Sequence, residues 1–123
     1  MYKLSKQIEI AGSHQLDLDY DSPCENLHGH NWIITVEVEG HFLNDNGMLI
    51  DFKHIKNVVN QLDHVYINDV VKVNPTAENI AHWIANKVQD EIDRQWKLGD
   101  NERTKVTKVS VQESEGNVAC ITL

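Results

Sequence analysis

Residues 24–38 read CENLHGHNWIITVEV and carry the strongest structural signal in the chain. From His28 onward, apolar side chains recur at every second position, which is typical of a strand with one buried face. That face should carry Trp32, Ile34, Val36 and Val38. Because side chains two apart in a strand share a face, His28 and His30 should lie together. Gly29 between them should leave room for a third ligand to approach.

An earlier strand leads toward a further histidine, His14. Its apolar residues alternate with polar ones, with one interruption at Lys6, and they are Leu4, Ile8 and Ile10. Three neutral imidazoles with one open position suit a catalytic zinc ion, so His14, His28 and His30 are candidate zinc ligands. The His-x-His spacing alone could be a chance pair, but Cys24 four residues ahead favours a metal site.

The role of Cys24 stays open at this stage. As a fourth ligand its thiolate would close a structural zinc site, whereas a thiol held off the metal could act as a base or nucleophile. Cys120 lies in an alternating strand, where inert packing is expected. The chain opens without the apolar core of a secretory signal, which favours a cytoplasmic location and two free thiols over a disulfide.

The length and charge of the chain limit the classes of protein to which it can belong. The 123 residues fit one domain covering 1–123, and no apolar run approaches the roughly 20 residues that span a bilayer. A net charge of -8 argues against a nucleic-acid surface, which needs a basic stripe. We therefore expect no membrane and no nucleic-acid partner, and a small-molecule substrate instead.

The remaining segments predict two helices followed by two strands. Asp51 should cap the first helix, whose apolar residues are Phe52, Ile55, Val58, Val59 and Leu62. Thr76 should cap the second, whose stripe is Ile80, Trp83, Ile84 and Val88. Residues 97–105 are polar and predict an exposed connection. Two closing strands flank the turn at residues 115–117, so the element order is ββααββ and the class is α+β.

Further polar residues could take part in chemistry. Asp63 and His64 could form a carboxylate–imidazole pair that exchanges a proton with a thiol, although such a pair is often only a helix-end feature. Any thiol partner must come from tertiary structure or another subunit. Glu113 could accept two hydrogen bonds from a ligand, or be a solvated turn residue. The other histidines are expected to be solvated or partly packed, and they are His41, His54 and His82.

Six segments match one enzyme family in register. They are Ser13-His14, Cys24-x-x-x-His28-Gly29-His30-Asn31, Gly47-Met48-Leu49-Ile50-Asp51-Phe52, Leu62-Asp63-His64, Pro75-Thr76-Ala77-Glu78-Asn79 and Val111-Gln112-Glu113. On these residues the chain resembles the pyruvoyl-tetrahydropterin synthase superfamily. Within it, the three residues between Cys24 and His28 resemble the bacterial branch, the 6-carboxy-tetrahydropterin synthases of queuosine precursor synthesis, because animal members carry more.

The resemblance implies a tunnelling fold, in which two helices pack on one face of an antiparallel sheet. Subunits join their sheets into an oligomeric barrel, typically a homohexamer built from two trimers, with active sites at the interfaces. It also implies roles for individual residues, namely His14, His28 and His30 as zinc ligands, Cys24 as the base, Asp63 and His64 as the groups that tune it, Glu113 as the pterin anchor, and Thr76 and Glu78 as pocket residues. Gln15 departs from the arginine often found after the first histidine.

The implied reaction is a zinc-dependent lyase reaction on 7,8-dihydroneopterin triphosphate. It yields 6-carboxy-5,6,7,8-tetrahydropterin and releases acetaldehyde and triphosphate. An acidic chain should gather a few lysines or an arginine locally to hold the triphosphate. One alternative is a 6-pyruvoyl-tetrahydropterin synthase, which eliminates triphosphate without cleaving a carbon–carbon bond. A second is a non-catalytic, zinc-stabilised oligomeric module.

Overall fold

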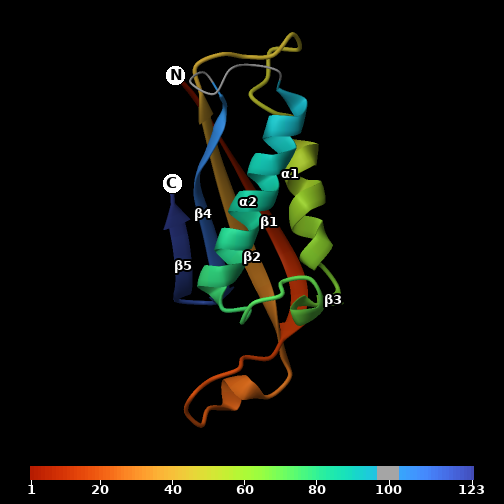
Figure 1. Cartoon of the computed structure of the whole chain (residues 1–123), viewed down its shortest axis with the longest axis vertical. Coiled ribbons are helices and arrows are strands. Elements are labelled where there is room, and N and C mark those ends of the chain that lie inside the picture. The colour runs from red at the N-terminus through yellow and green to blue at the C-terminus, as the bar shows by residue number, and fades with distance from the viewer. Residues whose placement is uncertain (97–102) are drawn as a thin grey trace.

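The computed structural model describes residues 1–96 and 103–123 and forms a five-stranded sheet covered on one face by two helices (Figure 1). The strands are β1 (Tyr2–His14), β2 (His28–Gly40), β3 (Val65–Tyr66), β4 (Lys105–Ser114) and β5 (Asn117–Thr122), in the order β3-β1-β2-β4-β5. The helices are α1 (Phe52–Val59) and α2 (Ala77–Gln95). The predicted α+β class and the order of the main elements are confirmed.

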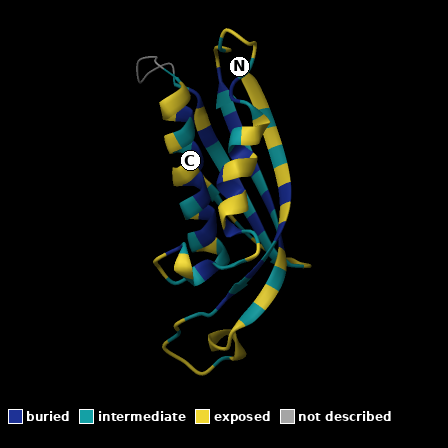
Figure 2. Cartoon of the chain, turned by 90° about the vertical axis from the view of Figure 1, so that its right-hand side faces the viewer, coloured by how far each residue is buried: buried dark blue, intermediate teal, exposed yellow. Residues whose placement is uncertain are grey.

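The core lies between the sheet and the helices, where the buried residues of both layers face each other (Figure 2). Alternation along β1 and β2 predicted this face correctly. Its buried residues include Ile8, Ile10, Trp32, Ile34, Val36 and Val38. Phe52 was predicted to belong to the apolar face of α1, but it is half exposed in the first turn of that helix. The Lys6 ammonium lies 6.0 Å from its ring centroid.

Both helices begin where the side-chain caps were predicted. Asp51 Oδ1 accepts a hydrogen bond from the backbone N–H of Lys53 at 3.0 Å, and Thr76 Oγ1 accepts one from Asn79 at 3.2 Å. Such caps satisfy backbone donors that have no partner within the helix. Leu62 lies beyond α1, in the short 3-10 helix η2 (Asn60–Leu62). No described helix combines the length and apolarity needed to span a membrane.

One strand was missed, and it makes the sheet mixed rather than purely antiparallel. β3 contains two residues and pairs in parallel with β1, with Gly12 opposite Val65 and Ser13 opposite Tyr66. Two residues are too few to produce a periodic pattern. β3 leads directly into the 3-10 helix η3 (Ile67–Asp69), and both elements contact the end of β1 that carries His14.

Two predictions near the C-terminal strands are wrong. Cys120 is exposed rather than packed, because β5 is an edge strand and only the face carrying Ala119 and Ile121 turns toward α2. Within the predicted exposed connection, residues 97–102 lie outside the described part of the chain. Thr104 is buried, and its carbonyl accepts a hydrogen bond from Gln89 Nε2 at 3.1 Å.

Candidate metal centre and active site

The pairing of β1 with β2 brings the three candidate histidines together. His14 lies directly opposite His28, and Gly12 lies opposite His30. Directly opposed residues of an antiparallel pair share a face, so all three imidazoles lie on the face that carries Trp32. Glycine at position 12 allows a close approach here, because a Cβ atom would lie 2.9 Å from Ile67 Cδ1 and 3.0 Å from the Leu62 carbonyl, and both neighbours would have to shift.

Gly29 does not play the role expected from the sequence. A Cβ atom at this position would meet only the Gly12 carbonyl oxygen, at 3.8 Å, which is an ordinary van der Waals contact. Side chains alternate along a strand, so a side chain here would point away from the face that holds His28 and His30. The approach of His14 therefore depends on strand register rather than on the missing side chain of Gly29.

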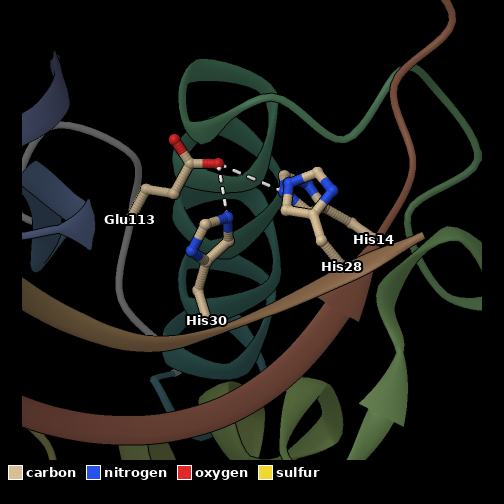
Figure 3. Close-up of side chains that lie close together, drawn as sticks. All are labelled: His14, His28, His30 and Glu113. Atoms are coloured by element: carbon tan, nitrogen blue, oxygen red, sulfur yellow. Dashed lines mark ion pairs between the residues drawn. The ribbon is translucent and has the colours of Figure 1, made fainter. Parts of the chain in front are cut away.

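The three rings and one carboxylate form a compact cluster (Figure 3). Ring centroids of His14 and His28 lie 4.5 Å apart, those of His28 and His30 lie 4.9 Å apart, and those of His14 and His30 lie 5.3 Å apart. One potential ligand atom from each histidine and from Glu113 lies within 4.8 Å of all the others. These four residues could hold a metal ion.

Backbone carbonyls orient two of the rings. His14 Nδ1 lies 2.8 Å from the Pro75 carbonyl oxygen, and His28 Nδ1 lies 2.6 Å from that of Asn26. A carbonyl can only accept, so each Nδ1 carries the proton and donates it. The lone pair of each ring is then on Nε2, which is the arrangement that carbonyl partners commonly impose on metal-binding histidines.

The remaining ring nitrogens fit a cation. Nε2 of His14 and Nε2 of His30 are buried and have no partner with hydrogen-bond geometry, although Glu113 Oε1 lies 3.1 Å from both. Buried polar atoms without partners are costly, and a shared divalent ion would satisfy them together with the carboxylate. A set of imidazoles is a donor set that suits zinc.

Burial lowers the pKa of His14, and the nearby imidazoles of His28 and His30 act in the same direction. The hydrogen bond to the Pro75 carbonyl and the Glu113 carboxylate oppose this shift but are outweighed. His14 is fully buried, so removal from water is the dominant cost of charging it. A neutral imidazole is the form that binds a metal ion.

This shift predicts that the metal-free protein loses stability in mild acid. Below about pH 6.5 the unfolded chain takes up a proton at His14 before the folded chain does. The free energy of unfolding should hold above that pH and then fall by up to about 1.4 kcal/mol per pH unit. Urea titrations at pH 7.5, 6.5 and 5.5 measure it. A His14→Gln variant should lose less, and equal slopes for the two proteins would contradict the prediction.

Glu113 belongs to the cluster rather than to a solvated turn. It lies on β4 where the pairing with β5 shifts register between Gln112 and Ser114, and its Oε1 lies 3.1 Å from Nε2 of both His14 and His30. Its side chain is only 28% exposed. The sequence left this residue undecided between a ligand contact and a turn, and the structure places its carboxylate against two of the imidazoles.

Trp32 borders the cluster, which the sequence analysis did not recognise. Its ring meets those of His14 and His30 edge to face, with centroid separations of 4.9 and 5.1 Å. Its indole N–H donates to the Gly12 carbonyl at 3.0 Å and is buried. The signal was available, because Trp32 follows His30 by two residues on the same predicted face.

Cys24 is exposed and is not a member of the four-residue cluster. It lies in the 3-10 helix η1 (Pro23–Glu25), within the loop that joins β1 to β2 and extends below the sheet in Figure 1. Ser22 Oγ accepts a hydrogen bond from its backbone N–H at 3.2 Å. The thiol is therefore carried by a different element from the candidate metal ligands.

Asp63 and His64 are held against β1. Asp63 Oδ1 accepts a hydrogen bond from the backbone N–H of Ala11 at 2.9 Å, and the backbone N–H of His64 donates to the Ala11 carbonyl at 2.6 Å. His64 has a φ of 55°, a left-handed conformation that is uncommon for a residue with a side chain. Its imidazole is 81% exposed and lies 3.6 Å from Asp63 Oδ2.

Two cavities lie near these residues. One of about 530 Å³ is lined by His30, His64, Tyr66 and residues near the end of β1. The other, of about 480 Å³, lies beside Pro75 and includes Lys72 among its lining residues. Of the predicted pocket residues, Thr76 uses its hydroxyl to cap α2, and Glu78 is an exposed residue of the first turn of that helix.

Comparison with known proteins identifies a single family over the chain. The family model described as 6-pyruvoyl tetrahydropterin synthase matches residues 3–122. A Pyrococcus abyssi protein, provisionally named 6-carboxy-5,6,7,8-tetrahydropterin synthase, is 33% identical over 94% of this chain and 86% of its own. The Bacillus subtilis 6-carboxy-5,6,7,8-tetrahydropterin synthase is 29% identical over 75% of this chain and 68% of its own.

The fold also matches solved structures. The Caenorhabditis elegans 6-pyruvoyl tetrahydropterin synthase superposes with a TM-score of 0.70 at 20% identity, covering 99% of this chain and 95% of that one. At this level of identity the match concerns the fold, and it covers the sheet, both helices and the segments that carry the cluster.

Proposed function

The chain belongs to the 6-pyruvoyl tetrahydropterin synthase family, and from that premise we propose that it is a zinc-dependent 6-carboxy-tetrahydropterin synthase. Its substrates would be 7,8-dihydroneopterin triphosphate and one molecule of water, and its products 6-carboxy-5,6,7,8-tetrahydropterin, acetaldehyde and triphosphate, in the synthesis of a queuosine precursor. The observation that carries this proposal is the convergence of three imidazoles and Glu113 on one small volume.

His14, His28 and His30 would hold the zinc ion. The buried Nε2 atoms that lack hydrogen-bond partners and the carbonyl-bound Nδ1 atoms support this assignment. When bound, Zn²⁺ would supply Lewis-acid polarisation of substrate oxygens. The chain's own residues would bind the substrate, orient it and move its protons.

Glu113 would accept hydrogen bonds from the amino edge of the pterin ring. A carboxylate has two oxygens that can accept such bonds in parallel, which fixes orientation as well as adding binding energy. Because the Oε1 atom lies 3.1 Å from Nε2 of both His14 and His30, this role requires the carboxylate to turn from the imidazoles toward the ring once the three histidines hold the ion. Thr76 and Glu78, at the start of α2, would line the same pocket.

Cys24 would accept a carbon-bound proton from the substrate side chain. A free thiol is mostly protonated at neutral pH, so a nearby imidazolium from His64, held by Asp63, would raise the thiolate fraction. Among the described residues no hydrogen bond or ion pair joins His64 to Cys24. We therefore assign the partner of each thiol to His64 of a neighbouring copy in an oligomer with interfacial sites, as in a homohexamer.

Product analysis with the triphosphate substrate tests the proposal. Acetaldehyde, released in equal amount to the carboxylated pterin, is the expected result. A pyruvoyl product without acetaldehyde would instead assign the chain to the elimination reaction, which uses the same fold and site. Zinc should be found at one ion per chain in the active preparation, and full activity after its removal would contradict the assignment.

A further inference from the structure

The loop that carries Cys24 is tied to itself by two hydrogen bonds. We define residues 15–27 as the thiol loop. The backbone N–H of Leu16 donates to the Cys24 carbonyl at 3.0 Å, and Gln15 Nε2 donates to the Glu25 carbonyl at 3.2 Å. Both bonds join the part of the loop that follows His14 to the part that precedes His28. The position of the thiol therefore depends on how the segment that follows His14 is held.

Gln15 is fixed at every polar atom. Asn68 Oδ1 accepts a hydrogen bond from its backbone N–H at 3.0 Å, and Asn68 Nδ2 donates to its carbonyl at 2.9 Å. One amide side chain thus pairs with the backbone in both directions, as a neighbouring strand would. In the side chain, Oε1 accepts from the Tyr66 hydroxyl at 2.9 Å while Nε2 reaches Glu25.

A second asparagine repeats this arrangement two residues later. Asn74 Oδ1 accepts from the backbone N–H of Asp17 at 2.9 Å, and Asn74 Nδ2 donates to the Asp17 carbonyl at 3.0 Å. Asn74 is itself anchored to the start of α2, because Asn79 Nδ2 donates to its carbonyl at 2.9 Å. The next carbonyl, from Pro75, orients His14. The same segment therefore holds the thiol loop and a candidate metal ligand.

We propose that Gln15 is a positioning residue for Cys24. Its amide donates to the Glu25 carbonyl within η1, whereas His28, the other described side chain that bonds residues 22–26 from outside, reaches only the Asn26 carbonyl that follows η1. The backbone of Gln15 is clamped independently of its amide bond by Asn68. The inference rests on the proposed function, in which the Cys24 thiol accepts a proton. A displacement of about 1 Å in a reacting group can cost about a hundredfold in rate, so even a modest loosening should be measurable.

Two substitutions separate the lost bond from a change of charge. Gln15→Met is close in size and uncharged, and it loses the donor to Glu25. Gln15→Glu also loses that donor but keeps an acceptor for Tyr66 and adds a negative charge. Gln95→Met is the matched control, because it makes the same change at an exposed glutamine at the end of α2, whose Nε2 donates to Glu91 Oε1 at 3.2 Å. All three keep the backbone groups that Asn68 clamps.

We expect both Gln15 variants to lower kcat about tenfold, with KM within about twofold, and to keep zinc content and melting temperature. Gln95→Met should stay within about twofold of wild type. Hydrogen exchange provides a readout without turnover. The amides of Leu16, Glu25 and Asn26 should exchange about tenfold faster in the two variants, and amides in the β1–β2 ladder should not change.

Results that differ from these would overturn specific parts of the proposal. Unchanged exchange in the thiol loop would refute positioning even if kcat fell, and faster exchange with normal kcat would refute its catalytic importance. A loss confined to Gln15→Glu would assign the effect to charge. If wild type itself produced no acetaldehyde and no pyruvoyl pterin, the proposed function would fail, and the exchange data would still decide whether Gln15 holds the loop.

Discussion

Replacing Cys24 with alanine is expected to lower turnover of dihydroneopterin triphosphate about a thousandfold, while zinc content and melting temperature stay near wild type. Loss of a general base typically costs between about a hundredfold and ten-thousandfold in rate. Stability should hold because the Cys24 side chain is exposed and lies outside the cluster of His14, His28, His30 and Glu113. Steady-state kinetics, metal analysis and thermal melting measure the three quantities.

Cys120→Ser is the matched control for this experiment. It is also a free, exposed thiol, but it lies on the edge strand β5, and its loss should change nothing that is measured. Loss of zinc together with unfolding of Cys24→Ala would support the alternative of a non-catalytic, zinc-stabilised module. In that case the thiol would be a fourth ligand rather than a base.

Replacing His30 with alanine should abolish both metal retention and activity. The substitution removes one of three imidazoles that would share the ion. Removing a residue that only hydrogen-bonds to a metal ligand already lowers metal affinity about 10- to 100-fold. The loss of a ligand itself should exceed that range. Added zinc raises the melting temperature of a protein that binds it only when folded, so the zinc-dependent shift should disappear in the variant.

His82→Ala is the control for the histidine experiment. His82 is exposed on α2, where its ring contacts Asn86 at 3.4 Å, and it is not part of the cluster. It should keep one zinc per chain and normal turnover. Stoichiometric zinc in His30→Ala, measured after gel filtration in the presence of a weak chelator, would show that the three imidazoles do not form the site.

The sequence predicted the parts of the structure that depend on short periodic patterns. Alternation along two 13-residue strands was enough to define the buried face of Trp32 and Ile34, and the same alternation grouped His28 with His30. Asp51 and Thr76 were recognised because a cap needs only the few residues next to it. Cys120 was misassigned, because alternation does not say which face of an edge strand is covered.

What the sequence did not predict depends on contacts between distant residues. The place of Glu113 follows from the alignment of β4 with β2, and that of β3 from a parallel pairing of two residues. The Asn68 and Asn74 clamps join side chains to a backbone more than 50 positions away. The left-handed backbone of His64 likewise reflects its docking on Ala11, which no local pattern specifies.

The pairing of His14 with His28 closes the ladder of β1 and β2 at the point where the thiol loop begins and ends. Residues added to or removed from the middle of that loop, away from Gln15 and from the Asn26 carbonyl that orients His28, would lie outside the ladder and leave the register of the imidazoles unchanged. Insertions there would move the sulfur while the three candidate ligands keep their places. Such an arrangement would give evolution a simple route to new reactions on one scaffold, because the proposed base could be relocated without rebuilding the proposed metal site.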